Sequence, residues 1–393
     1  MRTLRNAILG VLILGFSFQM LNAQETQKET FELTMKLEGR IMYDFDFLSA
    51  GDDYDYAGSE FRRVRMAAKG KVAKNIGYKA EFDFAGGGVN FRDVYLKFTL
   101  PAKVGALIVG SFTEPTSLNN MTSSKYMTFF ERSMMANTQP FKYNSGFMYN
   151  NHNALDGKLG VQLAYTFNGD KKAAFLDKSI KDGGNFIARV TGAVLNNKEK
   201  HQVVHLGINY EHRDNDSENY AYTFREENHM GDKFTVLGLE GKFENTSDVG
   251  FELATTFGPL SIQAEYELSS IITDVDTYKA NGYYAFASFF VTGEYRPYKN
   301  SSFGRVKPKK DLDIKEGGFG ALELVARYSV MDFSNYPGVS SNDKIVNITA
   351  GFNWYLNNYT RIMYNYINAN FNDFKVYGDD NLAGHLIRVQ VDF

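Results

Sequence analysis

Apolar and polar residues alternate along most of this chain, and the longest unbroken alternation is FELTMKLEGRIMYDFDF, residues 31–47. The odd positions from Phe31 to Phe47 are apolar or glycine, and the even positions are polar except Met42. Successive side chains of a β-strand point to opposite faces, so the stretch predicts a strand with one apolar and one charged face. It exceeds the ~5–6 residues of an average strand and is long enough to cross an apolar layer at a tilt.

The same alternation recurs to the end of the chain. Its clearest further stretches are 62–72, 76–84, 158–167, 201–212, 261–268, 320–329, 344–356, 361–368 and 386–393. Short turns such as 74–75 separate some strands, and long polar loops such as 213–219 and 300–316 separate others. We predict about 16 strands, with 18 as the upper count, because the pattern is weak over 170–245.

Long alternating strands joined by short turns and long loops indicate an all-β protein, a transmembrane antiparallel β-barrel. Apart from helices, closed barrels are the structures that satisfy every backbone hydrogen bond in lipid. The last strand, LIRVQVDF, is expected to pair with the first, with Ile387, Val389, Val391 and Phe393 toward lipid and Arg388 and Gln390 toward the lumen. A secreted β-sandwich, whose apolar face is a core, is the alternative.

The first residues predict export. Arg2 and Arg5 precede an apolar run, Ala7–Phe18, and small residues precede a cleavage point between Ala23 and Gln24. The run is shorter than the ~20 residues of a spanning helix. We therefore expect a signal peptide, residues 1–23, and one barrel domain, residues 24–393.

Composition and motifs argue against several classes of function. The chain has no cysteine, which excludes disulfides and thiolate metal sites, and residues 24–393 carry 41 basic and 46 acidic side chains, a charge of −5. This balance excludes a general nucleic-acid-binding surface. Sequences typical of hydrolases, metalloproteases and nucleotide-binding loops are missing, so neither enzymatic activity nor a cofactor is expected. His201 and His205 lie about 13 Å apart on one strand face, and His212 faces the other way, which argues against a metal site.

A basic row on one strand is the first candidate for solute binding. Arg63, Arg65, Lys69 and Lys71 alternate with apolar residues, and neighbours two apart stand about 6.6–7 Å apart on one face. Lining a pore, they would lower the barrier for anions. Acidic residues of neighbouring strands could equally neutralise the row and give a weakly selective pore. Alternation adds four further lumen candidates: Arg40, Arg189, Arg327 and Arg361.

The stretch 109–135, VGSFTEPTSLNNMTSSKYMTFFERSMM, lacks alternation. It combines aromatic residues and methionines with Lys125, Glu131 and Arg132, a composition unsuited to a loop exposed to water. Folding back into the barrel would bury it and constrict the channel, which makes these three residues constriction-loop candidates. The alternative is an extracellular loop packed on its neighbours.

Several motifs together resemble the phosphate-selective porin O and P family of Gram-negative bacteria. They are RRVRMAAKGKV, YKAEFDF, FRDVYLKF, the VG-x-F…TSS…FFERS run, GEYRPY, GGFGALELVARYS, GFNWYLNNYTRIMYNY and LIRVQVDF. The resemblance implies a 16-stranded, homotrimeric barrel in the outer membrane, in contact with lipid and lipopolysaccharide, whose third long loop folds inward. We map that loop onto Thr113–Asn137. The family's arginine ladder and lysine-rich lumen are interspersed with acids here, so the resemblance supports the porin role more directly than the anion.

We therefore expect an outer-membrane porin for passive diffusion of small hydrophilic solutes, with some preference for anions such as phosphate. Two alternatives are an outer-membrane barrel enzyme with a site at its rim, and a closed structural or adhesin barrel that binds partners through its long loops.

Overall fold

The computed structural model describes residues 31–51, 54–101, 103–138, 143–167, 183–214, 222–236, 241–335, 344–371 and 381–393. The expected signal peptide, residues 1–23, lies outside these residues. None of the helices within the described ranges is long and apolar enough to cross a membrane.

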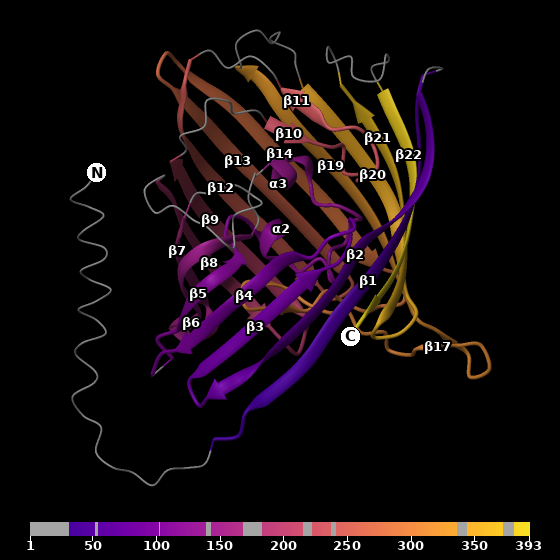
Figure 1. Ribbon diagram of the computed structural model, residues 1–393. Coiled ribbons are helices and arrows are strands. Elements are labelled where there is room, and N and C mark those ends of the chain that lie inside the picture. The colour runs from indigo at the N-terminus through magenta and orange to yellow at the C-terminus, as the bar shows by residue number, and fades with distance from the viewer. Residues whose placement is uncertain are drawn as a thin grey trace.

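Sixteen antiparallel strands close into one barrel (Figure 1). In order around the barrel they are β1 (Thr34–Ala50), β2 (Tyr54–Ala73), β3 (Ile76–Asp83), β4 (Asn90–Thr99), β5 (Ala106–Thr113), β6 (Tyr143–Ala154), β7 (Leu159–Phe167), β8 (Gly184–Asn197), β9 (Gln202–Asp214), β12 (Phe243–Phe257), β13 (Leu260–Thr273), β14 (Thr277–Phe290), β19 (Ala321–Asn335), β20 (Lys344–Tyr355), β21 (Thr360–Asn370) and β22 (Asn381–Asp392). The predicted barrel and the count of 16 are confirmed. The upper count of 18 and the sandwich alternative are wrong.

Alternation along β1 places apolar side chains outside and polar ones inside. Phe45 and Phe47 are 37 % and 47 % exposed on the outer face, whereas Asp44 and Asp46 between them are 2 % exposed toward the lumen. This is the reverse of a soluble domain and the pattern that a lipid-facing barrel requires.

The barrel closes between its first and last strands, as predicted. Ile387 of β22 lies opposite Phe45 of β1, and Arg388 lies opposite Asp44. Outward residues of β22 are exposed, while Arg388 and Gln390 are buried on the lumen side. Gly39 lies against the ring of Phe393, where a Cβ would come within 2.5 Å of Cζ. Closure leaves the first and last strands without a free edge.

The two rims differ in their connections. The C-terminus and the short turns 74–75, 155–158, 198–201, 258–259 and 356–359 lie at one rim, here called the turn rim. Opposite it, at the loop rim, lie the connections from β5 to β6 and from β9 to β12. Residues 291–320, between β14 and β19, are an exception to the expected division, because this long segment connects strands at the turn rim. The parity of the strands fixes that position, since β14 runs toward the turn rim.

Three inward-folding segments occupy the lumen (Figure 1). The constriction loop, residues 114–138, contains α2 (Leu118–Met121) and α3 (Met134–Thr138). The hairpin segment, residues 222–236, contains β10 (Tyr222–Phe224) and β11 (Phe234–Val236). The turn-rim segment, residues 291–320, enters the lumen with β15 (Tyr298–Lys299) and β16 (Ser302–Phe303), whereas the hairpin of β17 (Leu312–Asp313) and β18 (Gly318–Phe319) projects away from the barrel at the turn rim (Figure 1). A one-turn 3-10 helix, η1 (Leu155–Gly157), lies in the turn after β6.

The apolar residues of the constriction loop are buried inside the barrel, which accounts for the composition of the loop. Phe129, Phe130 and Met134 join an apolar cluster with lumen residues of the opposite wall, among them Phe286 and Met363. The ring centroids of Phe129 and Phe286 are 5.2 Å apart in an edge-to-face contact. The predicted inward fold of this loop is confirmed, and the alternative of an extracellular loop is wrong.

Candidate functional site: the lumen and its constriction

The constriction loop is anchored to the barrel wall through its own backbone carbonyls. Four carbonyl groups within residues 127–131 accept hydrogen bonds from wall side chains. The pairs are Met127 with Arg361 at 2.8 Å, Thr128 with Asn353 at 2.8 Å, Phe130 with Arg388 at 2.7 Å and Glu131 with Arg327 at 3.0 Å. An irregular segment has no ladder to satisfy its carbonyls when buried, so the wall supplies the donors.

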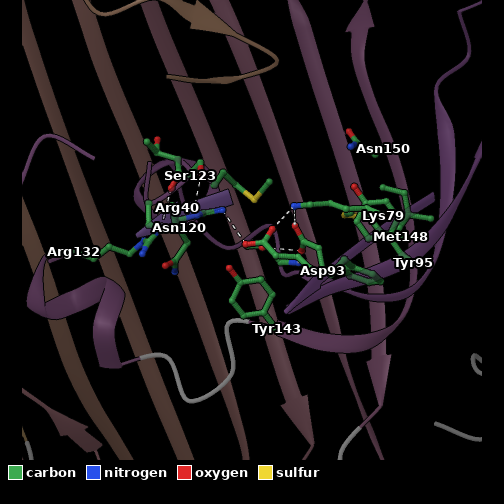
Figure 2. A pocket seen from close by; sticks show the side chains of 17 residues that line it. Arg40, Lys79, Asp93, Tyr95, Asn120, Ser123, Arg132, Tyr143, Met148 and Asn150 are labelled. Atoms are coloured by element: carbon green, nitrogen blue, oxygen red, sulfur yellow. Dashed lines mark hydrogen bonds and ion pairs between the residues drawn. The ribbon is translucent and has the colours of Figure 1, made fainter. Parts of the chain in front are cut away.

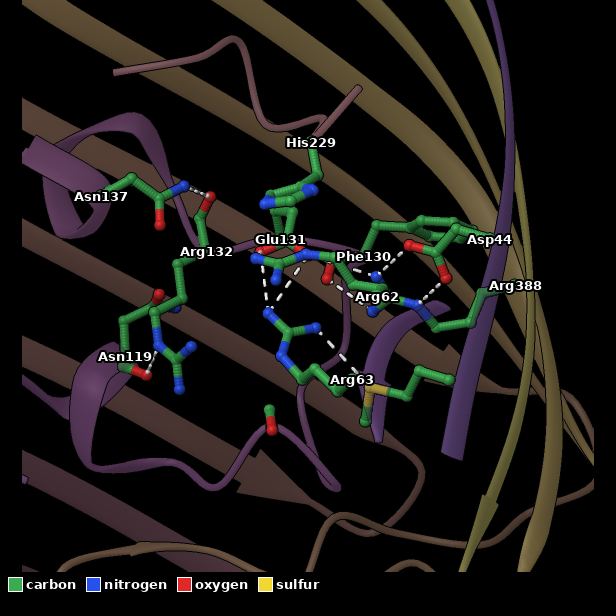
Figure 3. Close-up of polar contacts among 12 residues, drawn as sticks. Asp44, Arg62, Arg63, Asn119, Phe130, Glu131, Arg132, Asn137, His229 and Arg388 are labelled. Carbon is green, nitrogen blue, oxygen red and sulfur yellow. Dashed lines mark hydrogen bonds and ion pairs between the residues drawn. The ribbon is translucent and has the colours of Figure 1, made fainter. Parts of the chain in front are cut away.

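Glu131 is the centre of this anchorage (Figure 3). Its carboxylate accepts from Arg62 Nε at 2.8 Å, from Arg63 Nη2 at 2.9 Å and from Arg388 Nη2 at 3.2 Å. Burial by itself would raise the pKa of Glu131, but the three guanidinium groups hold that pKa well below its ordinary range. The loop is therefore attached to β2 and β22 through a carboxylate that stays ionised.

Three cavities lie between the constriction loop and the barrel wall in the part of the chain that the structure describes. Figure 2 shows the first, where Arg40, Lys79, Asp93 and Tyr143 of the wall face Ser123 of the loop. The second shares Arg40, Lys79, Glu81 and Ser123 with the first, and the third shares Glu38, Lys125 and Tyr126 with the second. Because neighbouring cavities share lining residues, the three are here called the joined cavities. The third is also lined by Asn358 and Tyr359 of the last turn, so the series extends to the turn rim.

Basic side chains pair with acidic ones in the first cavity. Arg40 donates to Glu81 at 2.8 Å and to Ser124 of the loop at 2.5 Å. Lys79 lies 2.6 Å from both Glu81 and Asp93. Each pairing leaves donors unused, because an ammonium carries three N–H groups and a guanidinium five.

Two loop bases also line this space. Arg132 donates to the carbonyls of Asn119 and Thr122 at 2.9 and 2.8 Å, and burial lowers its pKa to about 10. Burial, followed by the neighbouring Arg40, lowers the pKa of Lys125. Both side chains reach the cavities from the loop side.

The predicted basic residues fall into distinct groups. Among them, the joined cavities are lined by Arg40, Arg65, Lys69, Lys125 and Arg132. The constriction loop is contacted by Arg63, Arg327 and Arg361, and it contains Glu131. Arg189 lies on the far wall, and Lys71 is exposed near the turn rim. Alternation therefore identified lumen residues without separating those that line open space from those that hold the loop.

The far wall and the turn-rim segment fill the other half of the lumen. Arg189 pairs with Glu252 through two 2.7 Å hydrogen bonds and donates to the Ser301 carbonyl at 3.1 Å. His205 lies between Glu252 and the Tyr298 hydroxyl, at 2.9 and 2.7 Å. These contacts hold residues 298–301 against the wall. Alternation placed His205 on a strand face, but it did not indicate that His205 contacts this segment or that the segment folds inward.

The turn-rim segment and the constriction loop meet inside the barrel. Ser302 Oγ donates to the Met121 carbonyl at 3.1 Å and lies 3.3 Å from the Thr122 hydroxyl. Arg305 stacks over the Tyr126 ring, 5.4 Å from its centroid. A loop that enters from one rim is thus joined to a segment that enters from the other.

The hairpin segment covers the constriction loop from the loop rim. Glu227 pairs with Arg327 and accepts from Asn347 at 2.8 Å, while His229 lies 2.5 Å from Glu60 of β2. Burial raises the pKa of Glu226 to about 8, and Asn228 donates to its carboxyl group at 2.9 Å. Neither the segment nor its acidic residues had been identified from the sequence. No group of three side chains suited to a metal ion occurs in the ranges that the structure describes.

Comparison with known proteins agrees with this architecture. The sequence pattern of the family "Phosphate-selective porin O and P" matches residues 35–393. The chain is 28 % identical to Porin O of Pseudomonas aeruginosa over 92 % of its own length and 89 % of that protein.

Solved structures give the same fold at lower identity. An anion-selective porin from Comamonas acidovorans superposes with a TM-score of 0.58 at 15 % identity, covering 92 % of this chain and 100 % of that one. The trimer form of OmpT from Vibrio cholerae gives 0.59 at 14 % identity, with the same coverage. The chain belongs to the phosphate-selective porin O and P family and is a porin of the Gram-negative outer membrane.

Proposed function

We propose that the protein passes small hydrophilic anions, phosphate among them, by diffusion along the three joined cavities. One observation carries this proposal: the cavities are lined by nine basic and three acidic side chains. The basic ones are Lys36, Arg40, Arg65, Lys69, Lys79, Lys125, Arg132, Arg305 and Lys307, and the acidic ones are Glu38, Glu81 and Asp93. Rings of basic side chains lower the barrier for anions. Transport in this proposal needs no cofactor and no covalent step.

Anion preference is compatible with a net acidic chain because buried acids of both walls are paired or lie away from the cavities. Asp44 and Asp83 of the near wall pair with Arg388 and Arg65. Five further buried acids of β9, β12 and β13 face the other half of the lumen: Glu211, Asp248, Glu252, Glu265 and Glu267. The anion path therefore runs beside the basic wall, and net charge is a poor guide to the charge that a solute meets.

The roles that we propose for the predicted residues follow from their contacts. Arg40, Arg65, Lys69, Lys125 and Arg132 would meet the solute directly. Arg63, Arg327, Arg361 and Glu131 would set the width of the path by holding the constriction loop. Arg189 would seal the far half, and Lys71 would add positive charge near the turn-rim mouth.

The reversal potential of purified protein in a planar bilayer tests the proposal. Under a KCl gradient, stepwise channels with an anion-directed reversal potential are expected, and exchanging chloride for phosphate should keep that sign. A cation-directed potential would reject anion preference. Silence of correctly folded protein would reject an open channel and favour a closed structural barrel.

We also infer that three copies assemble in the outer membrane, in contact with lipid and lipopolysaccharide. The likeness to the trimer form of OmpT supports this assembly. The mass of the detergent-solubilised protein before and after heating tests it, and a monomeric mass under both conditions would reject it.

A further inference from the structure

Glu38 occupies an unusual position in the joined cavities. It lines both the second and the third cavity, and it is the one acidic side chain among the described residues that line the third. Every other charged side chain that lines the third cavity is basic: Lys36, Lys125, Arg305 and Lys307. Asp392 pairs with Arg305 outside this lining, so Glu38 is the side-chain carboxylate that an anion meets in the third cavity.

Three ammonium groups from different parts of the chain surround that carboxylate. Lys69 Nζ of β2 lies 2.6 Å and Lys36 Nζ of β1 3.3 Å from Glu38 Oε1, while Lys125 Nζ of the constriction loop lies 3.8 Å from Oε2. The Lys36 and Lys69 side chains are 70 % and 44 % exposed. Their remaining N–H groups are thus open to water in the cavities.

A solute anion would compete with Glu38 for the same donors. Carboxylate and phosphate oxygens both accept charge-assisted hydrogen bonds from ammonium groups. The carboxylate has the advantage of being tethered, so it is present at a high effective concentration. Conduction requires binding strong enough to admit an ion and weak enough to release it. An internal competitor within a cluster of lysines shifts this balance toward release.

We propose that Glu38 is a specificity-determining residue, a built-in counter-anion that occupies Lys36, Lys69 and Lys125 between solutes and shortens the residence of small oxyanions there. This inference rests on the proposed anion-conducting function. It adds a residue whose charge is opposite to that of the path, and whose loss should improve binding rather than impair it.

The test is phosphate block of single-channel chloride current in wild type and Glu38→Gln. Removal of the carboxylate should lower the half-blocking phosphate concentration by up to about five-fold, the upper end of the range for a partly exposed ion pair, and lengthen each blocking event. Glu38→Asp, which keeps the charge, should stay closer to wild type. An unchanged half-blocking concentration in a folded, anion-selective Glu38→Gln channel would overturn the inference.

A matched control separates local binding from surface charge. Glu316 is an exposed acid in the turn-rim segment, outside the residues that line the three cavities. Glu316→Gln removes the same charge and should leave the phosphate block as in wild type. An equal decrease in half-blocking phosphate concentration in Glu38→Gln and Glu316→Gln would overturn the local role of Glu38.

The lysine cluster supplies a second variant. In the double variant Glu38→Gln/Lys69→Gln one ammonium is lost with the carboxylate, and the half-blocking concentration should return toward wild type. If the double variant keeps the full decrease in half-blocking concentration seen in Glu38→Gln, the lysine cluster is not the phosphate-binding site. A cation-directed reversal potential in wild type is a different result, because it rejects the proposed function itself.

Discussion

Arg388 of the last strand donates two hydrogen bonds to the Asp44 carboxylate of the first strand, Nε to Oδ1 at 2.7 Å and Nη2 to Oδ2 at 2.5 Å. The same guanidinium donates to the Phe130 carbonyl and to Glu131 of the constriction loop. Both side chains of the pair are almost fully buried. One arginine therefore joins barrel closure to the position of the loop that narrows the channel.

Arg388→Met should weaken both features. It leaves the Asp44 carboxylate buried without its partner, and breaking a buried pair in this way costs about 3–5 kcal/mol. Urea unfolding of the detergent-refolded barrel should show a loss of this size, and single channels should become noisier as the loop loosens. The double variant Asp44→Asn/Arg388→Met should lose less than the sum of the single losses. Unaltered stability in Arg388→Met would contradict the pairing.

Glu131→Gln should reveal the stabilisation that depends on the lowered pKa of Glu131. The carboxyl group of the unfolded chain titrates near its ordinary value of 4.5, above the folded value. The contribution is therefore complete above pH 4.5 and is lost as pH falls through the folded pKa. The difference in unfolding free energy between wild type and variant should stay level from neutral pH to about pH 5 and shrink below it. A difference that does not change in acid would refute this assignment.

The residues around Glu131 show where sequence reasoning succeeded and where it stopped. Strict alternation placed Arg63 and Arg65 in the lumen, and both are there. It would place Arg62 outside, but a bulge in β2 pairs Met42 with Arg63 and Tyr43 with Phe61, so Arg62 is the extra residue. The shift lets Arg62 and Arg63 both reach Glu131. A bulge changes the phase of a strand without marking the sequence.

The partners of the basic residues could not be read from strand order either. Neighbouring strands do supply Glu81 and Asp83 for Arg65, as cross-strand neutralisation predicted. Arg327, however, pairs with Glu227, 100 positions away in the hairpin segment. The weak pattern over 170–245 has the same origin, because this region holds wall strands β8 and β9 together with short strands β10 and β11 that lie within the lumen. The residues of an inward-folding segment are buried according to its packing in the lumen, so its sequence does not alternate between apolar and polar positions.

Glu226→Gln should change how the stability of the hairpin segment depends on pH between 4.5 and 8. Burial raises the pKa of Glu226 from 4.5 to about 8, so between these values the folded state holds a proton that the unfolded state releases. Stability from this group therefore falls as pH rises from 4.5 through 8 and is level above. Proteolysis of residues 225–233 should accelerate over that range in wild type and stay flat in the variant, whose amide is always neutral. Parallel pH profiles in the two proteins would count against a protonated Glu226.

The route of the solute can be mapped in this protein without removing native thiols, because the chain contains no cysteine. Ser123 lines the first and second cavities, whereas Thr191 of β8 bonds to Ser301 at 2.8 Å in the filled half of the lumen. A negatively charged methanethiosulfonate should react with Ser123→Cys and sharply reduce anion current, since the attached sulfonate places a like charge in the path. Thr191→Cys, the matched control, should react slowly and keep its current. Rapid block of both variants would mean that solute also passes along the far wall, and block of Thr191→Cys alone would move the route there.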